Sequence, residues 1–413
     1  MSTGKRGCRF SIGEQKYEEV WIRATGVGGG LFTFGFVVDT GFRILFLASW
    51  YPHRGQPTLG NFVERHAHAV ALGHRVEVLY LVGEPGRMEP EFETVVNGAL
   101  VEHRVYHAER PSMRKRWRLL KAAVEAFFSG ELSGFDLVHV HVVHPVGWQA
   151  QALKQRYGLP FVVTEHWTGF HNGRFEQLPR LHRKLAKRTA RMAAVVCPVS
   201  AHLGKAMQAQ GLAGRYQVVP NVVDTALFVP RQSGSSEVKQ LLHVSHLGDE
   251  HKNISGMLRA FKAAVGAGHK LHLAVVGDGD TRPHQATAEA LGLTGEHVSF
   301  DGEQPLATIA ARMGQSDGFV LFSNYENLPC VMIEAWSAGV PVVSTDVGGI
   351  AEHLTPERGW LLPKGNEAAL TAAFAALAGA SPDPKALREY AQTHFSPEAV
   401  CRAFTEVYQT ALA

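Results

Sequence analysis

The sequence predicts an α/β protein with two domains, each built on a parallel sheet covered by helices on both faces. Apolar runs of strand length alternate with segments of helical pattern along most of the chain, which is typical of repeated strand–helix–strand units. At 413 residues the chain is long enough for two separate cores. The polar stretch 231–237 fits a linker. We therefore expect domains over residues 43–235 and 236–395, with the boundary near residue 235.

The first domain is expected to begin at the strand 43–48. Further strands are predicted at 74–81, 136–141, 161–164 and 195–200, with helices at about 62–71 and 146–157. Residues 1–42 fit no part of this alternation, and Glu14, Glu18 and Glu19 ahead of an apolar patch argue against a signal peptide. We expect these residues to be a disordered extension or a start assigned too early, with the true start near Val37.

The second domain is expected to begin with a strand at 240–245. The runs that we predict as its other strands are 271–277, 298–302, 318–323 and 340–344. The last helix, over 396–413, has Val400, Phe404, Val407 and Tyr408 at helical spacing, so one of its faces is predicted to pack in a core.

A chemically informative stretch lies within residues 326–349, ENLPCVMIEAWSAGVPVVSTDVGG. Pro329 suits the first turn of a helix over 330–338, and Gly339 is placed to end that helix. A helix that starts just after a parallel strand offers free N–H groups and a partial positive charge to a phosphate. Glu326 and Glu334 at this end suggest a ligand rich in hydroxyl groups, bound beside an anion.

This stretch resembles a known family. Glu326 and Glu334, the phrase AWSAGVPVV and a Gly-Gly-x-x-Glu ending at Glu352 are similar to the retaining nucleotide-sugar glycosyltransferases of family four, or group 1. The resemblance runs from about residue 43 to the C-terminus. It implies the GT-B fold, in which two Rossmann-like domains face a cleft and the C-terminal helix crosses back to the first domain.

The resemblance also implies an activity, namely hexosyl transfer from a GDP- or UDP-linked sugar to a hydroxyl of a glycan or lipid-linked glycan. It implies neither a metal nor a cofactor. A nucleotide-sugar epimerase of the same fold and a non-catalytic nucleotide-sugar-binding protein remain as alternatives. An NAD-binding protein is disfavoured, because Arg282 and Pro283 follow Gly277-x-Gly279 where a dinucleotide fingerprint needs a third glycine and a helix start.

The family's site residues map onto this sequence position by position. Lys252 would neutralise the donor diphosphate, Glu326 would bind sugar hydroxyls, and His166 would orient the sugar; a buried structural histidine is the alternative for His166. The implied catalytic residues are thus Glu326, Lys252 and His166. The implied donor-binding residues are Gly60, Asn61, His246, Lys252, Gly277, Gly302, Glu326, Leu328, Cys330, Val331 and Glu334. His246 departs from the family, which has arginine there.

Two possible metal sites are weighed against simpler interpretations. His139, His141 and His144 have a spacing that metal ligands can adopt, but no acid or cysteine accompanies them. Asp278 and Asp280 follow an apolar strand, as metal-binding acids do in the other glycosyltransferase fold, but here they occupy the family's turn beside the nucleotide. No metal site is predicted.

Charge is distributed unevenly along the chain. Residues 43–238 hold 24 Lys/Arg against 15 Asp/Glu, whereas 239–413 hold 12 against 19. The basic segments 110–121 and 180–191 fit an anionic membrane surface or a diphosphate-bearing acceptor, and they equally fit solvated helix faces. No nucleic-acid partner is predicted. No apolar run has the length of a membrane span, and the scattered Cys8, Cys197, Cys330 and Cys401 favour a reducing cytoplasm.

Overall fold

The computed structural model describes residues 41–109, 112–230, 237–293, 295–379 and 382–413. Residues 1–40 of the expected extension or early start at 1–42, residues 231–236 of the expected linker at 231–237 and part of the first basic segment lie outside the described residues. Phe42, which we assigned to the extension, stacks on His74 with the ring centroids 5.4 Å apart.

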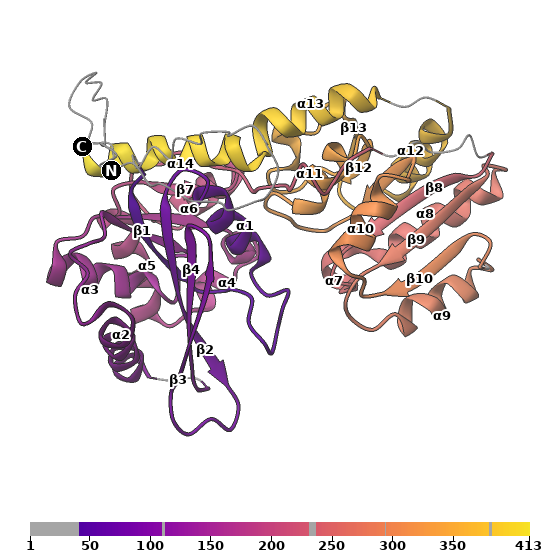
Figure 1. The fold of residues 1–413 in the computed structure, drawn as a ribbon. Coiled ribbons are helices and arrows are strands. Elements are labelled where there is room, and N and C mark those ends of the chain that lie inside the picture. Colours follow the sequence, from indigo (N-terminus) through magenta and orange to yellow (C-terminus); the bar gives the residue numbers. More distant parts are fainter. Residues whose placement is uncertain (1–40, 110–111, 231–236, 294, 380–381) are drawn as a thin grey trace, which may run out of the picture.

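The N-terminal domain contains a seven-stranded sheet in the order β3-β4-β2-β1-β5-β6-β7 (Figure 1). Its strands are β1 (Arg43–Ala48), β2 (Arg75–Glu84), β3 (Glu91–Asn97), β4 (Leu100–Ala108), β5 (Leu137–His141), β6 (Phe161–Glu165) and β7 (Val196–Pro198). Its helices are α1 (Asn61–Val70), α2 (Met113–Phe128), α3 (Gly147–Tyr157), α4 (Arg174–Gln177), α5 (Arg180–Met192) and α6 (Ala201–Ala209), with a 3₁₀ turn at Thr168–Phe170. Leu45 and Leu47 pack in one core while Ile44 and Phe46 pack in the other, so β1 is buried on both faces.

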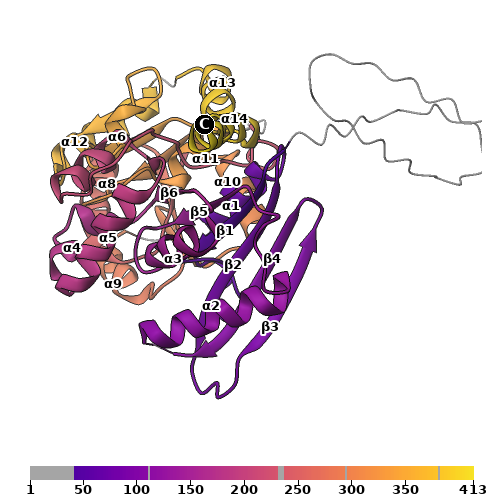
Figure 2. The same cartoon turned by 90° about the vertical axis from the view of Figure 1, so that its left-hand side faces the viewer.

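Sequence reasoning missed the hairpin formed by β3 and β4. β3 pairs antiparallel with β4 at the edge of the sheet, and Figure 2 shows it at the outer side of the domain. Most of β3 is exposed. The two strands are joined by a two-residue loop that begins with Gly98, which has a φ of +62°. The Asn97-Gly98 pair between two runs rich in β-branched and aromatic residues was a usable signal for a hairpin.

The C-terminal domain contains a six-stranded sheet in the order β10-β9-β8-β11-β12-β13, and all of its pairs are parallel. Its strands are β8 (Lys239–Val244), β9 (Leu271–Val276), β10 (Val298–Gly302), β11 (Gly318–Leu321), β12 (Val342–Thr345) and β13 (Gly359–Leu362). Its helices are α7 (Asp249–Lys252), α8 (Ile254–Gly266), α9 (Arg282–Ala290), α10 (Leu306–Met313), α11 (Cys330–Ser337), α12 (Glu367–Gly379) and α13 (Pro384–Phe395), with a 3₁₀ turn at Ile350–Glu352. The prediction of two Rossmann-like parallel-sheet domains is confirmed.

The last helix, α14 (Pro397–Leu412), returns to the N-terminal domain. In Figure 1, α13 and α14 run in yellow along the top of the molecule, from the C-terminal to the N-terminal domain. Val400 and Phe404 of α14 are buried in the same core as Val63 and Ala67 of α1. The predicted crossing of the C-terminal helix is therefore confirmed, and it ties the two domains together.

Two further observations bear on sequence predictions. Within the described ranges, no helix is both long and apolar enough to cross a membrane. Cys197, Cys330 and Cys401 are free thiols.

Candidate active site

The buried ion pair between Lys252 and Glu326 is the centre of the candidate site. Lys252 ends the short helix α7, and Glu326 lies in the loop between β11 and α11. The Nζ of Lys252 is 2.5 Å from Oε1 of Glu326, and the hydroxyl of Ser323 donates a 2.8 Å hydrogen bond to the same oxygen. Burial acts to raise the pKa of Glu326, but the charges of Lys252 and His251 and the hydrogen bonds from Lys252 and Ser323 together outweigh it, so this pKa is lowered. Glu326 is consequently a carboxylate at neutral pH.

His251 adds a titratable group to this pair. Its Nε2 lies 3.7 Å from Oε1 of Glu326, and its ring stacks on Tyr325 with the centroids 4.1 Å apart. Burial, and then the charge of Lys252, lower the pKa of His251. Sequence reasoning did not single out this histidine, although it precedes Lys252 directly.

Glu334 is held by an arginine from the other domain. The Nη1 of Arg65, on α1, is 2.5 Å from Oε1 of Glu334, on α11. Both side chains are largely buried, with 15% and 4% of their surfaces exposed. Burial disfavours the charge on Arg65, but Glu334 overcomes this and raises the arginine's pKa. Sequence reasoning missed Arg65; its place on the helix that follows Gly60 was the signal that could have found it.

The loop before α11 is also bonded to the N-terminal domain. The side-chain amide of Asn327 donates to the backbone carbonyl of His166 at 2.5 Å, and its oxygen lies 2.9 Å from Nε2 of His171. Asn221 donates to the carbonyl of Leu328 at 2.7 Å. The two domains therefore meet directly at the candidate site, and Leu328 takes part through its backbone.

The Gly-Gly-x-x-Glu ending has a structural role in this contact. Gly348 has a φ of +62°, and a Cβ there would lie 2.0 Å from the carbonyl oxygen of Glu326. Glu352 accepts hydrogen bonds from the backbone N–H groups of Ala201 (2.8 Å) and His202 (2.7 Å), at the start of α6. An acid at a helix N-terminus is stabilised by the free N–H groups there. This motif thus supports Glu326 and joins the domains.

Gly60 and Asn61 lie at the start of α1. Gly60 has a φ of +67°, and a Cβ there would lie 2.5 Å from the carbonyl carbon of Trp50. A glycine is therefore needed at residue 60 because the chain approaches itself. Asn61 is the first residue of α1.

The helix α11 begins as predicted beside the two acids. Pro329 is the N-cap residue of this helix, with an extended ψ of 125°, and so lies one position before the first turn in which we expected it. Gly339, with a φ of +73°, follows the end of the helix. The first N–H groups of the helix, those of Cys330 and Val331 among them, have no acceptor within it. Burial raises the pKa of the Cys330 thiol to about 11.

The remaining predicted donor residues lie at the carboxyl edge of the C-terminal sheet. Gly277 follows β9 and donates a 2.9 Å backbone hydrogen bond to Gly302 at the end of β10. His246 follows β8 and is exposed, and its ring makes no hydrogen bond within the part of the chain that the structure describes. As predicted, 278–280 form the turn after β9, where Asp280 pairs with Arg282 at 2.6 Å.

On the N-terminal side, three buried histidines form a cluster of His66, His141 and His166. One ring nitrogen of each lies within 4.8 Å of the others. Burial lowers all three pKa values, that of His66 to about 4, so the rings are neutral at pH 7. Both ring nitrogens of His141 and Nε2 of His166 are buried and have no hydrogen-bond partner among the described residues.

This histidine cluster differs from the set that we considered in the sequence. His139 is bonded to Tyr408 at 2.8 Å and to Thr164 at 2.7 Å, so both of its nitrogens are satisfied. His144 faces His182 instead, with the ring centroids 5.0 Å apart. The set of His139, His141 and His144, which we did not favour as a metal site, does not come together, because the topology brings His66 from α1 to His141 instead.

Comparisons with known proteins agree on one family. A family model described as "Glycosyl transferases group 1" matches residues 238–379, and one described as "Glycosyltransferase Family 4" matches residues 63–227. The chain is 29% identical over 252 residues to a phosphatidyl-myo-inositol mannosyltransferase of Mycobacterium leprae. That match covers 59% of this chain and 64% of the relative, a little under two thirds of its length. The chain is also 26% identical to TuaC of Bacillus subtilis, named for teichuronic acid biosynthesis, over 75% of this chain and 82% of that protein.

Solved structures share the fold at low identity. Sucrose-phosphate synthase from Thermosynechococcus elongatus has a TM-score of 0.72 and 21% identity, over 89% of this chain and 98% of that one. The Anabaena protein HepE in complex with UDP has a TM-score of 0.65 and 19% identity, over 89% of this chain and 100% of that one.

Proposed function

Because the chain belongs to the group 1, family four glycosyltransferases, which act on nucleotide-sugar donors, we propose that it is a retaining enzyme that uses a GDP- or UDP-linked sugar. The sugar passes to a hydroxyl of a glycan or a lipid-linked glycan. The observation that carries this proposal is the buried Lys252–Glu326 pair directly before α11. It places a fixed cation, a carboxylate and a helix N-terminus together between the domains.

Stabilising the departing nucleoside diphosphate is the main task of such a site. Fixed positive charges and aligned N–H groups are worth most where water is excluded. Lys252 is 8% exposed, and the N–H groups of Cys330 and Val331 start α11. We assign these three groups to the diphosphate.

Arg65 is proposed as a further cation for the diphosphate. His246 stands where the family has arginine, and its side chain is exposed. This position therefore lacks the permanent positive charge that the family's arginine supplies. Arg65 lies close enough to Cys330, the first residue of α11, for the two groups to interact. Since Arg65 comes from the N-terminal domain, it would complete the diphosphate site only when the domains are closed.

The two glutamates are assigned to the two sugars of the donor. Glu326 would accept hydrogen bonds from the transferred sugar and lie near the positive charge that develops on it. Glu334 would bind the ribose hydroxyls; Arg65 uses only Oε1 of this carboxylate. Oε2 accepts no hydrogen bond from the described residues and is suited to a ribose hydroxyl.

His166 is assigned to orienting the transferred sugar from the N-terminal side. Its Nε2 is buried without a hydrogen bond among the described groups. A neutral imidazole offers one donor and one acceptor nitrogen, so it can bind a sugar hydroxyl without adding charge. Its carbonyl is bonded to Asn327, the neighbour of Glu326, which couples its position to the donor side.

The names of the relatives support the proposed acceptor classes. One relative is named a phosphatidyl-myo-inositol mannosyltransferase, and another is named for teichuronic acid biosynthesis. A cytoplasmic location and the absence of a nucleic-acid partner stay predictions. So does the absence of a metal, although the histidine cluster could offer three ligand nitrogens.

Nucleotide titration tests the proposal. We expect UDP or GDP to bind to the wild-type protein and to raise its melting temperature, and the matching nucleotide sugar to be consumed only when an acceptor is present. The product should retain the anomeric configuration of the donor, which proton NMR measures. The same reaction in EDTA tests metal independence. Conversion of the donor without acceptor would favour an epimerase, and binding without turnover across acceptor classes would favour a non-catalytic protein.

A further inference from the structure

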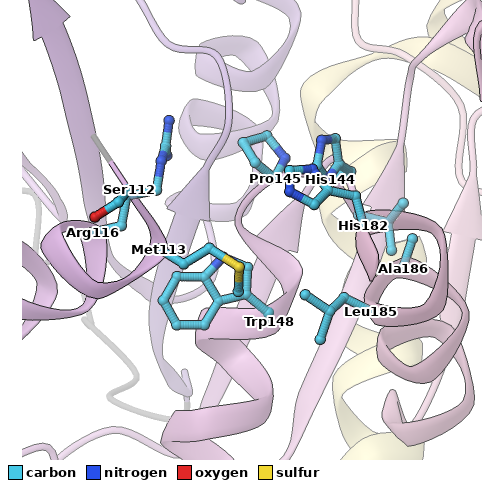
Figure 3. Close-up of a pocket in the computed structure, with 10 residues that line it drawn as sticks. Ser112, Met113, Arg116, His144, Pro145, Trp148, His182, Leu185 and Ala186 are labelled. Carbon is cyan, nitrogen blue, oxygen red and sulfur yellow. The ribbon is translucent and has the colours of Figure 1, made fainter. Parts of the chain in front are cut away.

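A pocket in the N-terminal domain lies between the two basic helices α2 and α5. Its volume is about 230 Å³. Figure 3 shows side chains of both helices facing it, together with those of the loop after β5. The residues that line it are Ser112, Met113, Arg116, Val143, His144, Pro145, Trp148, His182, Leu185 and Ala186.

Arg116 has no counter-ion in the part of the chain that the structure describes. Its side chain makes no ion pair and no hydrogen bond within the described ranges. Burial lowers its pKa, and no carboxylate offsets this effect. A partly buried guanidinium without an anion is costly, whereas Arg65, in the candidate active site, has Glu334. Arg116 is therefore placed as a binding group for an anion.

Two histidines line the pocket beside Arg116 and add positive charge only when they are protonated. The rings of His144 and His182 are 5.0 Å apart. The pKa of His144 is lowered to about 4, first by burial and then by the charges of His182 and Arg116. All the charged or titratable side chains that line the pocket are thus bases. A bound anion would favour their protonated forms.

The rest of the lining is apolar. Met113, Trp148, Leu185 and Ala186 form this part, and Figure 3 shows the Met113 side chain beside the Trp148 ring. Trp148 also lies near Trp117 of α2, with the ring centroids 6.3 Å apart. One region of the pocket therefore suits an anion and another suits an alkyl chain.

The pocket is connected to the candidate active site through the carboxylate of Glu165. Val143 in its wall donates a 2.9 Å hydrogen bond to Oε2 of Glu165, and the other oxygen of Glu165 accepts from the N–H of His166 at 2.8 Å. His141, in the histidine cluster, precedes Val143 by two residues. The pocket thus adjoins the same carboxyl edge of the sheet as His166.

We propose that this pocket binds the phosphate headgroup of an amphiphilic acceptor, with the phosphate at Arg116 and the start of its apolar chain over Met113 and Trp148. The inference rests on the proposed function, because it gives the acceptor of that reaction its chemical class. Ligand pockets for whole drug-sized molecules measure about 300–1,000 Å³, so a pocket of about 230 Å³ takes a headgroup and leaves the chain outside. The exposed lysines and arginines of α2 and α5 then face the surface that carries the headgroup.

Direct binding of small probes tests this proposal. The probes are octyl phosphate below its micelle concentration, octanol, inorganic phosphate and glucose 6-phosphate, titrated against the full chain by calorimetry. We expect octyl phosphate to bind at least tenfold more tightly than the other three. If glucose 6-phosphate binds as tightly as octyl phosphate, the assignment of an amphiphilic acceptor is overturned, and the result points to a soluble phosphorylated acceptor.

The matched variants are Arg116→Gln and Arg118→Gln. Both remove one positive charge from α2, but Arg118 is exposed and does not line the pocket. Arg116→Gln should lower the affinity for octyl phosphate at least tenfold, and Arg118→Gln should leave that affinity within twofold of the wild-type value. Equal loss in both variants, or no loss in Arg116→Gln, would overturn the proposal.

Nucleotide binding separates this proposal from the proposed function. UDP or GDP should bind Arg116→Gln as it binds the wild type, which also shows that the variant is folded. If the wild type binds octyl phosphate through Arg116 but binds no nucleotide, the proposed function fails and the pocket remains. If nucleotide binds but octyl phosphate does not, only the pocket assignment fails. Trp148→Leu should lower the affinity for octyl phosphate without changing the affinity for inorganic phosphate.

Discussion

The two sides of the interdomain contact treat buried charge differently. On the C-terminal side, each of the two acids has a cation within 2.5 Å, Lys252 for Glu326 and Arg65 for Glu334. On the N-terminal side, the histidine cluster has no acid partner among the residues that the structure describes, and its rings stay neutral because burial lowers their pKa values. The donor side is thus a set of paired charges, and the other side is a set of neutral groups with unused hydrogen-bonding capacity.

This difference has an energetic meaning. A buried ion pair costs most when one partner is removed, because the other charge is then left without compensation. A buried imidazole costs little folding stability while it stays neutral. The loss of stability appears only when the pH falls, because the unfolded state then takes up a proton that the buried ring does not. Mutation should therefore disturb the donor side most, and acid should disturb the histidine side most.

Removing Lys252 should give the largest effect. In Lys252→Ala, we expect kcat/KM to fall about 10³-fold, the size of effect seen when one group that stabilises a developing charge is removed. Steady-state kinetics with the cognate nucleotide sugar measure it. The matched control is Lys270→Ala, which removes an exposed lysine paired with Glu237 in the same domain. Wild-type turnover in Lys252→Ala would contradict the assignment to the leaving group.

Breaking the Arg65–Glu334 pair should destabilise the protein by about 3 kcal/mol, because one buried charge is left unpaired. Urea unfolding of Glu334→Gln and Arg65→Gln measures this, and donor KM should rise about tenfold in both variants. The double variant Arg65→Met with Glu334→Met should lose less stability than the two single variants together. Additive losses would show that the pair is not coupled.

The histidine side should respond to pH. The folded-state pKa of His66 is about 4, below the ordinary 6.5, so its contribution to stability is present above pH 6.5 and is lost as the pH falls toward 4. The slope is about 1.4 kcal/mol per pH unit for each such histidine. Glu165 acts in the opposite direction, because burial raises its pKa to about 7; its contribution is present below pH 4.5 and is lost as the pH rises toward 7.

Denaturation between pH 7.5 and 4.5 measures the net slope, which should show falling stability, since the cluster has three histidines against this one acid. His66→Gln should reduce the slope by about 1.4 kcal/mol per pH unit. His68→Gln is the control, because His68 is exposed on the same helix. An unchanged slope in His66→Gln would mean that the ring is not held neutral by burial.

The smallest effect is expected at Glu352, which bonds across the domains without being part of either buried pair. Glu352→Gln should cost about 1 kcal/mol, the usual worth of a helix N-terminal interaction. Glu357→Gln, an exposed acid bonded within its own turn to Thr355, is the control. A loss above about 3 kcal/mol in urea unfolding would show that this bond, rather than the Arg65–Glu334 pair, dominates the contact between the domains.

Much of the fold was predictable because its signals are local. The strand 43–48 and the helix at 330–338 were placed within a residue of their observed ends, since apolar run length, proline and glycine act on the nearest neighbours. The edge hairpin of β3 and β4 was missed. The site was predicted in part: the resemblance to a family motif singled out Lys252 and Glu326, but it did not predict their ion pair, and the roles of these residues stay predictions.

By itself, the sequence determined the two sheets, the order of the elements and the place of the two acids at a helix start, because these depend on local propensity and period. Only the tertiary structure decided what each buried group faces. Arg65 and Glu334 are 269 positions apart, and His66, His141 and His166 come from three separate segments. Pairing and desolvation depend on which distant segments pack together, and residue spacing along the chain does not encode that.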